Sequence, residues 1–299
     1  MSSSPGHSPE ALAPSGTRLP PLRCRRFCLN LTTRTQIMGV LNVTPDSFSD
    51  GGLYVDAGRA VEYAHQMIEE GADLIDVGGE STRPGAEPVS AEEELRRILP
   101  SVKRLVKKLA VPISVDTYKA DVAAVVLAEG VDLINDVSGL SFDPRLASVV
   151  AEAGAGLVLT HIQGTPRIMQ TDPKYTDVVA EVREHLQERV LVAETRGVHP
   201  EAIVVDPGIG FGKRVEHNLI LLNRLAELHV LGKPLLVGPS RKSFIGTVLD
   251  LPVEERLEGS AAAVAAAIWQ GVHIVRVHDV RAMVRVARMT DAIRKASES

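Results

Sequence analysis

The chain has 299 residues and a formal net charge of −5, with 38 acidic against 33 basic side chains. A protein with this charge does not neutralise a phosphate backbone over a broad surface, which excludes a general nucleic-acid binder. Aromatic residues make up only 3% of the chain, and this also argues against a stacking platform for single strands. The length is ordinary for one α/β barrel and does not require two domains.

Residues 1–18 are rich in Ser, Pro, Gly and Ala, which predicts a disordered tail before a single domain at 19–299. Cys24 and Cys28 are too few for a disulfide framework, and their spacing lacks the second ligand pair of a zinc site. No apolar run reaches the roughly 18 residues of a membrane span, and the N-terminus has no apolar signal core. We therefore expect a cytoplasmic protein.

Short apolar runs rich in Val and Ile alternate with longer segments of helical periodicity, after a weakly predicted hairpin in 19–35. Strands are predicted at 36–41, 73–77, 112–115, 132–135, 156–160, 202–206, 234–237 and 273–277. Helices are predicted at 56–71, 90–109, 119–129, 143–153, 175–196, 215–230, 255–270 and 279–296. This strict alternation predicts a (β/α)8 TIM barrel. The rival fold is an open doubly wound sheet, which usually has a glycine-rich nucleotide-binding turn after its first strand. Here the first strand is followed by residues 42–46, NVTPD, which do not form such a turn.

Polar residues end or follow the predicted strands, where a barrel of this kind places its active site. They are Asn42, Asp76, Asp116, Asn135, His161, Asp206, Ser240, Lys242, Arg276 and His278. A single Asp at a strand end is often a helix cap or a turn former. Three such carboxylates on one rim would repel each other without cationic partners, and Lys242 and Arg276 are the candidates for that role.

These residues divide into two halves with different chemistry. Asn42, Arg276 and His278, together with loop backbone, would form an anion-binding half. The other half, which contains Asp116, Asn135, Asp206 and Lys242, suits a flat heterocycle that has N–H donors and an amino group.

Two long polar loops at 42–55 and 78–89 are typical of lids above a barrel site. The motif Gly208-x-Gly210-x-Gly212-Lys213 does not have the spacing of a phosphate-cradling loop. We interpret Lys213 as a solvated side chain.

Seven sequence blocks, in order from about 36 to 281, resemble the dihydropteroate synthase family. They are MGVLNVTPDSFSDGG (38–52), GADLIDVGGESTRPGA (71–86), VPISVDTYK (111–119), INDVSG (134–139), IVVDPGIGFGK (203–213), VGPSRKSFIG (237–246) and VRVHDV (275–280). The resemblance implies a (β/α)8 barrel, usually a homodimer. It also implies an enzyme of folate biosynthesis that joins 4-aminobenzoate to 6-hydroxymethyl-7,8-dihydropterin diphosphate and releases 7,8-dihydropteroate and diphosphate.

The same resemblance implies roles for individual residues. Asp116, Asn135, Asp206 and Lys242 would bind the pterin, and Asn42 would help to hold Mg²⁺ on the diphosphate. Thr82, Arg83, Arg276 and His278 would contact the diphosphate, and Ser240 would lie near the aminobenzoate, where sulfonamides would compete. The predicted substrate-binding set is Asn42, Asp76, Thr82, Arg83, Asp116, Asn135, Asp206, Phe211, Ser240, Lys242, Arg276 and His278. The predicted catalytic residues are Asp116, Lys242, Arg276 and His278.

One departure from the family pattern is visible after the fifth strand, where Thr160-His161-Ile162 stands in place of the Met-His-Met that the family often has. It changes a wall of the expected pterin pocket without removing an ionisable group.

Two rival functions remain: a pterin-binding methyltransferase that uses methyltetrahydrofolate, and a catalytically inactive barrel that serves as a binding protein. The methyltransferase has no use for a diphosphate clamp, and the STRPG, SRKS and RVHD stretches favour the synthase. The inactive barrel would be expected to have lost Lys242 or Arg276, and both are present.

Overall fold

The computed structural model describes residues 19–43, 53–82 and 85–296. The predicted tail at 1–18, Arg83 and most of the 42–55 loop lie outside the described residues. Within the described ranges, no helix is both long enough and apolar enough to cross a membrane.

Eight parallel strands form one sheet in the order β8-β7-β6-β5-β4-β3-β10-β9. The strands are β3 (Gln36–Asn42), β4 (Leu74–Gly78), β5 (Ile113–Asp116), β6 (Leu133–Asp136), β7 (Gly156–Thr160), β8 (Ile203–Asp206), β9 (Leu236–Val237) and β10 (Ile274–Val277). The two ends of this sheet meet, because the amide of Val205 donates to the carbonyl of Pro234 at 2.9 Å and Val205 also bridges to Leu235. The predicted TIM barrel is therefore confirmed.

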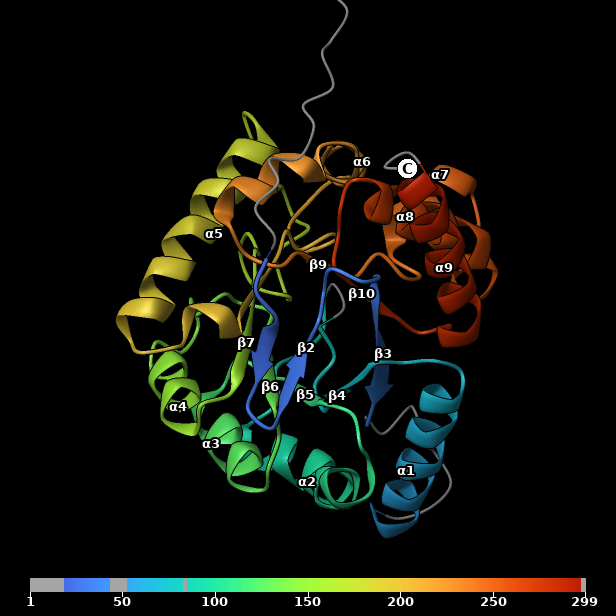
Figure 1. Cartoon of the computed structure of the whole chain (residues 1–299). Coiled ribbons are helices and arrows are strands. Elements are labelled where there is room, and N and C mark those ends of the chain that lie inside the picture. The colour runs from blue at the N-terminus through green and yellow to red at the C-terminus, as the bar shows by residue number, and fades with distance from the viewer. Residues whose placement is uncertain (1–18, 44–52, 83–84, 297–299) are drawn as a thin grey trace, which may run out of the picture.

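Helices surround the strands on all sides (Figure 1). They are α1 (Leu53–Glu69), α2 (Ala91–Lys108), α3 (Ala120–Ala128), α4 (Leu146–Ala153), α5 (Val178–Thr195), α6 (Val215–Asn223), α7 (Ser243–Leu249), α8 (Leu257–Trp269) and α9 (Val280–Ala296). The prediction missed α7, which has seven residues and is too short to show a helical period. The helix predicted at 215–230 is wrong in part, since α6 ends at Asn223 and a 3₁₀ helix follows at Leu225–Leu231.

The alternation of side chains along each strand creates two separate cores. Residues that point outward, such as Ile75, Val77 and Val115, pack under the helices in the larger core. Residues that point inward fill the barrel itself in a second cluster: Leu22, Cys24, Leu31, Met38, Leu74, Leu133, Val158, Val204, Leu236 and Ile274. The inner cluster is apolar toward the amino ends of the strands, and polar residues take over the inward positions nearer the carboxyl ends.

A hairpin closes the amino-terminal end of the barrel. Strands β1 (Leu22–Cys24) and β2 (Phe27–Leu29) pair antiparallel and lie across the strands in Figure 1. Leu22 and Cys24 are fully buried in the inner cluster. Because this end is plugged by apolar side chains, the opposite, carboxyl end is where the polar interior meets solvent.

Candidate active site

The strand register brings four sequence-distant residues to one level at the carboxyl end of the barrel. Asn42 of β3 pairs with Gly78 of β4, Gly78 with Asp116 of β5, and Asp116 with Asn135 of β6. Asp76 precedes Gly78 by two positions on β4 and therefore points inward one layer deeper. The predicted convergence of these polar residues is what the parallel register produces.

Arg276 on β10 joins two of the carboxylates. Its Nε donates to Asp76 Oδ2 at 2.6 Å and its Nη2 donates to Asp116 Oδ2 at 2.9 Å. Asn135 Nδ2 donates to the same Asp76 oxygen at 3.0 Å. The other oxygen of Asp76, Oδ1, is buried and has no partner among the described residues. This acceptor and the partly exposed side chain of Arg276 are the polar groups that the network leaves for a ligand.

The pKa of Asp116 is raised to about 7, with burial as the largest cause. The guanidinium of Arg276 opposes the shift, whereas the charges of Asp76 and Glu94 add to it. A carboxyl whose pKa lies near 7 exchanges its proton in the physiological range, which is typical of groups at functional sites.

A second group surrounds Asp206 at the end of β8. Its Oδ1 accepts from the amide of Gly208 at 2.7 Å, and burial raises the pKa of Asp206 to about 6. Lys242 Nζ lies 3.9 Å from the centroid of the Phe211 ring. Burial, assisted by the charge of Arg276, lowers the pKa of Lys242 to about 8, against the attraction of Asp206 and Asp116. A cation, a carboxylate and an aromatic face therefore come together at the mouth of the barrel.

His278 and Ser240 form a hydrogen-bonded pair beside Arg276. The His278 Nδ1 and Ser240 Oγ are 3.0 Å apart, and the His278 amide also donates to this oxygen at 3.3 Å. Burial, followed by repulsion from Arg276, lowers the pKa of His278 to about 4. The imidazole is therefore neutral near pH 7, and it can offer a hydrogen bond to an anion but no positive charge.

Asn42 and Thr82 end or follow two neighbouring strands, β3 and β4. Asn42 ends β3 and is partly exposed, and its Oδ1 is 3.6 Å from the point that a Cβ on Gly78 would occupy. Thr82 is half-buried in the loop after β4. The neighbouring Arg83, which sequence reasoning included, lies outside the described residues.

A buried ionic cluster next to Asp116 was not predicted from the sequence. Lys119 Nζ binds the carboxylates of Glu80 and Glu94, and Tyr118 Oη donates to Glu80 Oε1 at 3.0 Å. Glu94 is almost fully buried, although it belongs to an acidic run at the start of α2 that looks like an ordinary solvated helix turn. The signal that could have found it is helical periodicity, because Glu94 lies on the same face of α2 as the apolar Ile98 and Val102.

The interpretation of Lys213 as a solvated side chain is wrong. Its side chain is only 2% exposed, and its Nζ is 2.8 Å from His161 Nδ1 and 3.0 Å from the carbonyl oxygen of Phe211. The cause is tertiary, because the loops after β7 and β8 pack over this side chain.

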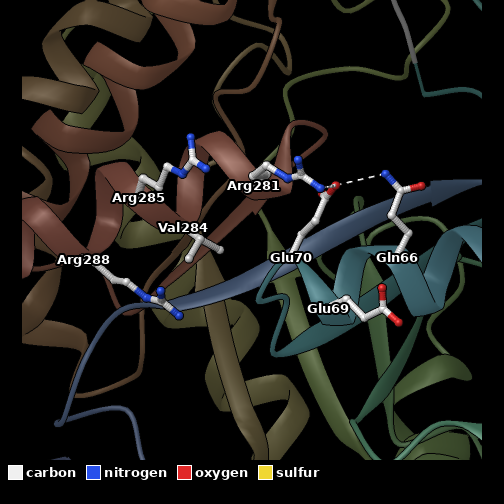
Figure 2. A pocket seen from close by; sticks show the side chains of 7 residues that line it. All are labelled: Gln66, Glu69, Glu70, Arg281, Val284, Arg285 and Arg288. Carbon is white, nitrogen blue, oxygen red and sulfur yellow. Dashed lines mark hydrogen bonds and ion pairs between the residues drawn. The ribbon is translucent and has the colours of Figure 1, made fainter.

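A surface hollow elsewhere, of about 430 Å³, lies between α1 and α9 (Figure 2). It is lined by Gln66, Glu69, Glu70, Arg281, Val284, Arg285 and Arg288. Glu70 binds Gln66 at 3.0 Å and Arg281 at 3.3 Å. The hollow contains none of the polar residues at the strand ends, so the chemistry of the site does not extend to it.

At its carboxyl end this parallel barrel presents carboxylates, an amide and two cations. The family model described as "Pterin binding enzyme" matches residues 38–278, and the chain belongs to this family.

Its relatives within the family are dihydropteroate synthases. The Synechocystis enzyme of that name is 48% identical over 275 residues, which cover 92% of this chain and 95% of the relative. The solved dihydropteroate synthase of Xanthomonas albilineans with 4-aminobenzoic acid is 44% identical, with a TM-score of 0.85 and coverage of 92% of this chain and 98% of that one. The Burkholderia cenocepacia enzyme complexed with 7,8-dihydropteroate is 44% identical, with a TM-score of 0.84 and coverage of 94% and 99%. The resemblance inferred from the sequence blocks is confirmed.

Proposed function

We propose that this chain is a dihydropteroate synthase, which condenses 6-hydroxymethyl-7,8-dihydropterin diphosphate with 4-aminobenzoate and releases diphosphate. The observation that carries the proposal is the set of buried Asn135 and Asp206 and partly buried Asp116 and Lys242 beside Arg276, in a chain whose relatives bear this name. The substrates are small molecules, and the polar set matches their two different ends.

The pterin ring would lie in the half of the site that contains the carboxylates. Ionised Asp206 and Asp116 accept hydrogen bonds from ring N–H and amino groups, and Asn135 can both donate and accept. Lys242 would donate to the carbonyl or a ring nitrogen, and the Phe211 ring beside it would offer a face to a flat substrate. The buried, unpartnered oxygen of Asp76 supports its inclusion in the substrate-binding set.

The diphosphate would lie at the solvent side of Arg276. The guanidinium keeps its positive charge here, because the neighbouring Asp76 and Asp116 outweigh the effect of burial and raise its pKa. His278 would add a hydrogen bond without charge, and Thr82 and Arg83 would contribute from the loop after β4. In the adjacent part of the site, Ser240 would lie near the aminobenzoate, where sulfonamides would compete.

The donor set at the mouth fits Mg²⁺ bound together with substrate phosphates. Mg²⁺ usually takes one or two protein oxygens and completes its shell with phosphates and water. Asn42 offers such an oxygen at the mouth of the barrel, and the described residues contain no cluster of three or more His, Cys, Asp or Glu that would form an all-protein site. Bound there, the ion would offset the charge of the departing diphosphate.

The reaction then needs little acid–base machinery. The bond between the methylene carbon and the diphosphate oxygen breaks, and diphosphate leaves with the bonding electrons. Arg276 stabilises that developing negative charge. The remaining cation is conjugated with the dihydropterin ring, and the carboxylate of Asp116 stabilises it electrostatically. The aryl amine attacks the methylene carbon and then loses a proton, so no strong general base is required.

We further propose that the enzyme is a homodimer, as the resemblance to the family implies, and that it acts in the cytoplasm.

A pterin-binding methyltransferase would share the carboxylate pocket but would have no use for a diphosphate clamp. The discriminating experiment is a coupled diphosphate-release assay on the purified chain with the pterin diphosphate, with and without 4-aminobenzoate and Mg²⁺. We expect release that requires both additions, together with dihydropteroate in equal amount. Methyl transfer without diphosphate release would overturn the proposal.

A further inference from the structure

The glycine-rich motif after β8, which does not cradle a phosphate, packs tightly against the loop after β7. A Cβ on Gly208 would lie 1.9 Å from the carbonyl oxygen of His161, and a Cβ on Gly212 would lie 2.4 Å from that of Gln163. Both glycines also have positive φ, at +69° and +62°. Only glycine permits this approach, so the motif brings two backbones together.

Lys213 lies where these two loops meet. Its Nζ has three acceptors within hydrogen-bonding range: His161 Nδ1 at 2.8 Å, the Phe211 carbonyl at 3.0 Å and the His161 carbonyl at 3.4 Å. An ammonium has three N–H donors, so its hydrogen-bonding capacity is filled by the two loops. Burial lowers the pKa of Lys213 to about 7, and the charge of Asp206 opposes that change.

The carbonyl that Lys213 holds belongs to a residue of the proposed substrate pocket. Phe211 lies between Gly210 and Gly212, and its ring is in contact with Lys242 Nζ. The same loop is tied by neutral hydrogen bonds as well, since Tyr175 Oη donates to the Gly212 carbonyl at 2.8 Å. Lys213 differs from Tyr175 because it binds the Phe211 carbonyl itself and is fully enclosed.

We infer that Lys213 is a positioning residue of the pterin pocket: it ties the loops after β7 and β8 together and thereby holds the Phe211 ring against Lys242. This inference rests on the proposed function, because it assigns Lys213 a purpose in the same pocket. Lys213 itself does not reach the substrate in this role, and its effect passes through Phe211.

The test compares Lys213→Met with Lys103→Met, which makes the same chemical change on the exposed face of α2. Calorimetric binding of 6-hydroxymethylpterin and steady-state kinetics are measured on both. For Lys213→Met we expect the Kd of the pterin and the KM of the pterin diphosphate to rise by about tenfold, as for a displaced binding group. The kcat should stay within about threefold, and Lys103→Met should match the parent protein.

The route through Phe211 is tested by a double-mutant cycle. When Phe211→Leu is already present, adding Lys213→Met should weaken pterin binding by less than about twofold. Tyr175→Phe, which removes a neutral tie to the same loop, should have the smaller effect of the two single changes. Additive losses in the cycle, or normal pterin binding by folded Lys213→Met, would overturn the inference.

Folding is checked by circular dichroism. If Lys213→Met does not fold, Lys213→Gln, which keeps N–H donors, is used for the same measurements, and failure of both to fold would assign Lys213 to folding alone and overturn the pocket role. Pterin binding is read without catalysis, so a parent protein that binds pterin but forms no dihydropteroate would contradict the proposed function and leave the positioning of Phe211 measurable.

Discussion

The Nε of Arg276 lies 2.6 Å from Oδ2 of Asp76, and the two residues are 200 positions apart in the chain. Asp76 is fully buried and the Arg276 side chain is about one-fifth exposed. The pair joins the last strand of the barrel to the second strand of the parallel sheet. It therefore connects the polar groups of these two strands, and the exposed part of the Arg276 side chain is available to an anion.

Removing this guanidinium should destabilise the protein. Arg276→Met would leave the carboxylates of Asp76 and Asp116 buried without their cation, which costs about 3–5 kcal/mol of unfolding free energy. Urea denaturation measures the loss, with Arg104→Met on the exposed surface of α2 as the control. A decrease of less than about 1 kcal/mol would show that the two carboxyls become protonated at little cost.

Activity should increase with pH through the titration of Asp116. Its pKa is raised to about 7, so lowering the pH below that value protonates the carboxylate that stabilises the pterin cation. We expect kcat/KM to fall on the acidic side of about pH 7, and this limb should be missing in Asp116→Asn, whose residual activity would be low. An unchanged acidic limb in that variant would assign the titration to another group, such as the substrate diphosphate.

The titration of Asp116 should lower the stability of the fold as pH rises, although it raises activity. Between its ordinary pKa of 3.8 and the raised value of about 7, the folded protein keeps a proton that the unfolded chain has released. By linkage, the contribution of Asp116 to stability falls as pH rises through this window and is constant above it. Asp116→Asn should therefore gain stability relative to the parent between pH 4 and 7, which denaturation at a series of pH values would measure.

Lys242→Ala and Asp206→Ala should each abolish dihydropteroate formation while the fold survives. Lys242 supplies the donor to the pterin and Asp206 an acceptor, and both lie at the open end of the barrel, away from the apolar cores. Product formation and circular dichroism on the same samples separate activity from folding. A correctly folded variant with normal activity would remove these residues from the pterin site.

Gly208→Ala should destabilise the protein by more than its backbone conformation alone requires. Gly208 and Gly232 have similar φ values of +69° and +63°, but a Cβ on Gly208 would meet the His161 carbonyl at 1.9 Å, whereas one on Gly232 would meet nothing within 4 Å. Gly232→Ala therefore measures the conformational cost, about 1–2 kcal/mol. Thermal denaturation of both variants should show the larger loss for Gly208→Ala, and equal losses would mean that the loop after β7 moves away freely.

The barrel and most of its site follow from the sequence because the relevant rules are local. Each strand is a short apolar run, and a polar residue at its carboxyl end must lie on the barrel rim once the strands are parallel. Asp116, Asn135 and Asp206 were found in this way. The family resemblance added Thr82 and Arg83, which no strand pattern identifies.

The remainder depends on tertiary contacts that no local pattern encodes. Lys213 follows a turn and looks solvated, yet the loop after β7 covers it. Glu94 shares an acidic run with more exposed neighbours; its place on the apolar face of α2 predicts burial, but the pairing with Lys119 depends on tertiary contacts. Likewise α7 has too few residues to show a period, and its place is set by the loop after β9.

The hairpin that plugs the barrel also constrains the order of events during synthesis. Leu22 and Cys24 leave the ribosome long before Leu236 and Ile274, which belong to the same buried cluster. Such contacts between distant parts of a chain form slowly, because a long loop must close first. The inner core therefore cannot be sealed until β10 has been made, and a nascent chain interrupted before that strand keeps the hairpin's apolar face uncovered and prone to aggregation.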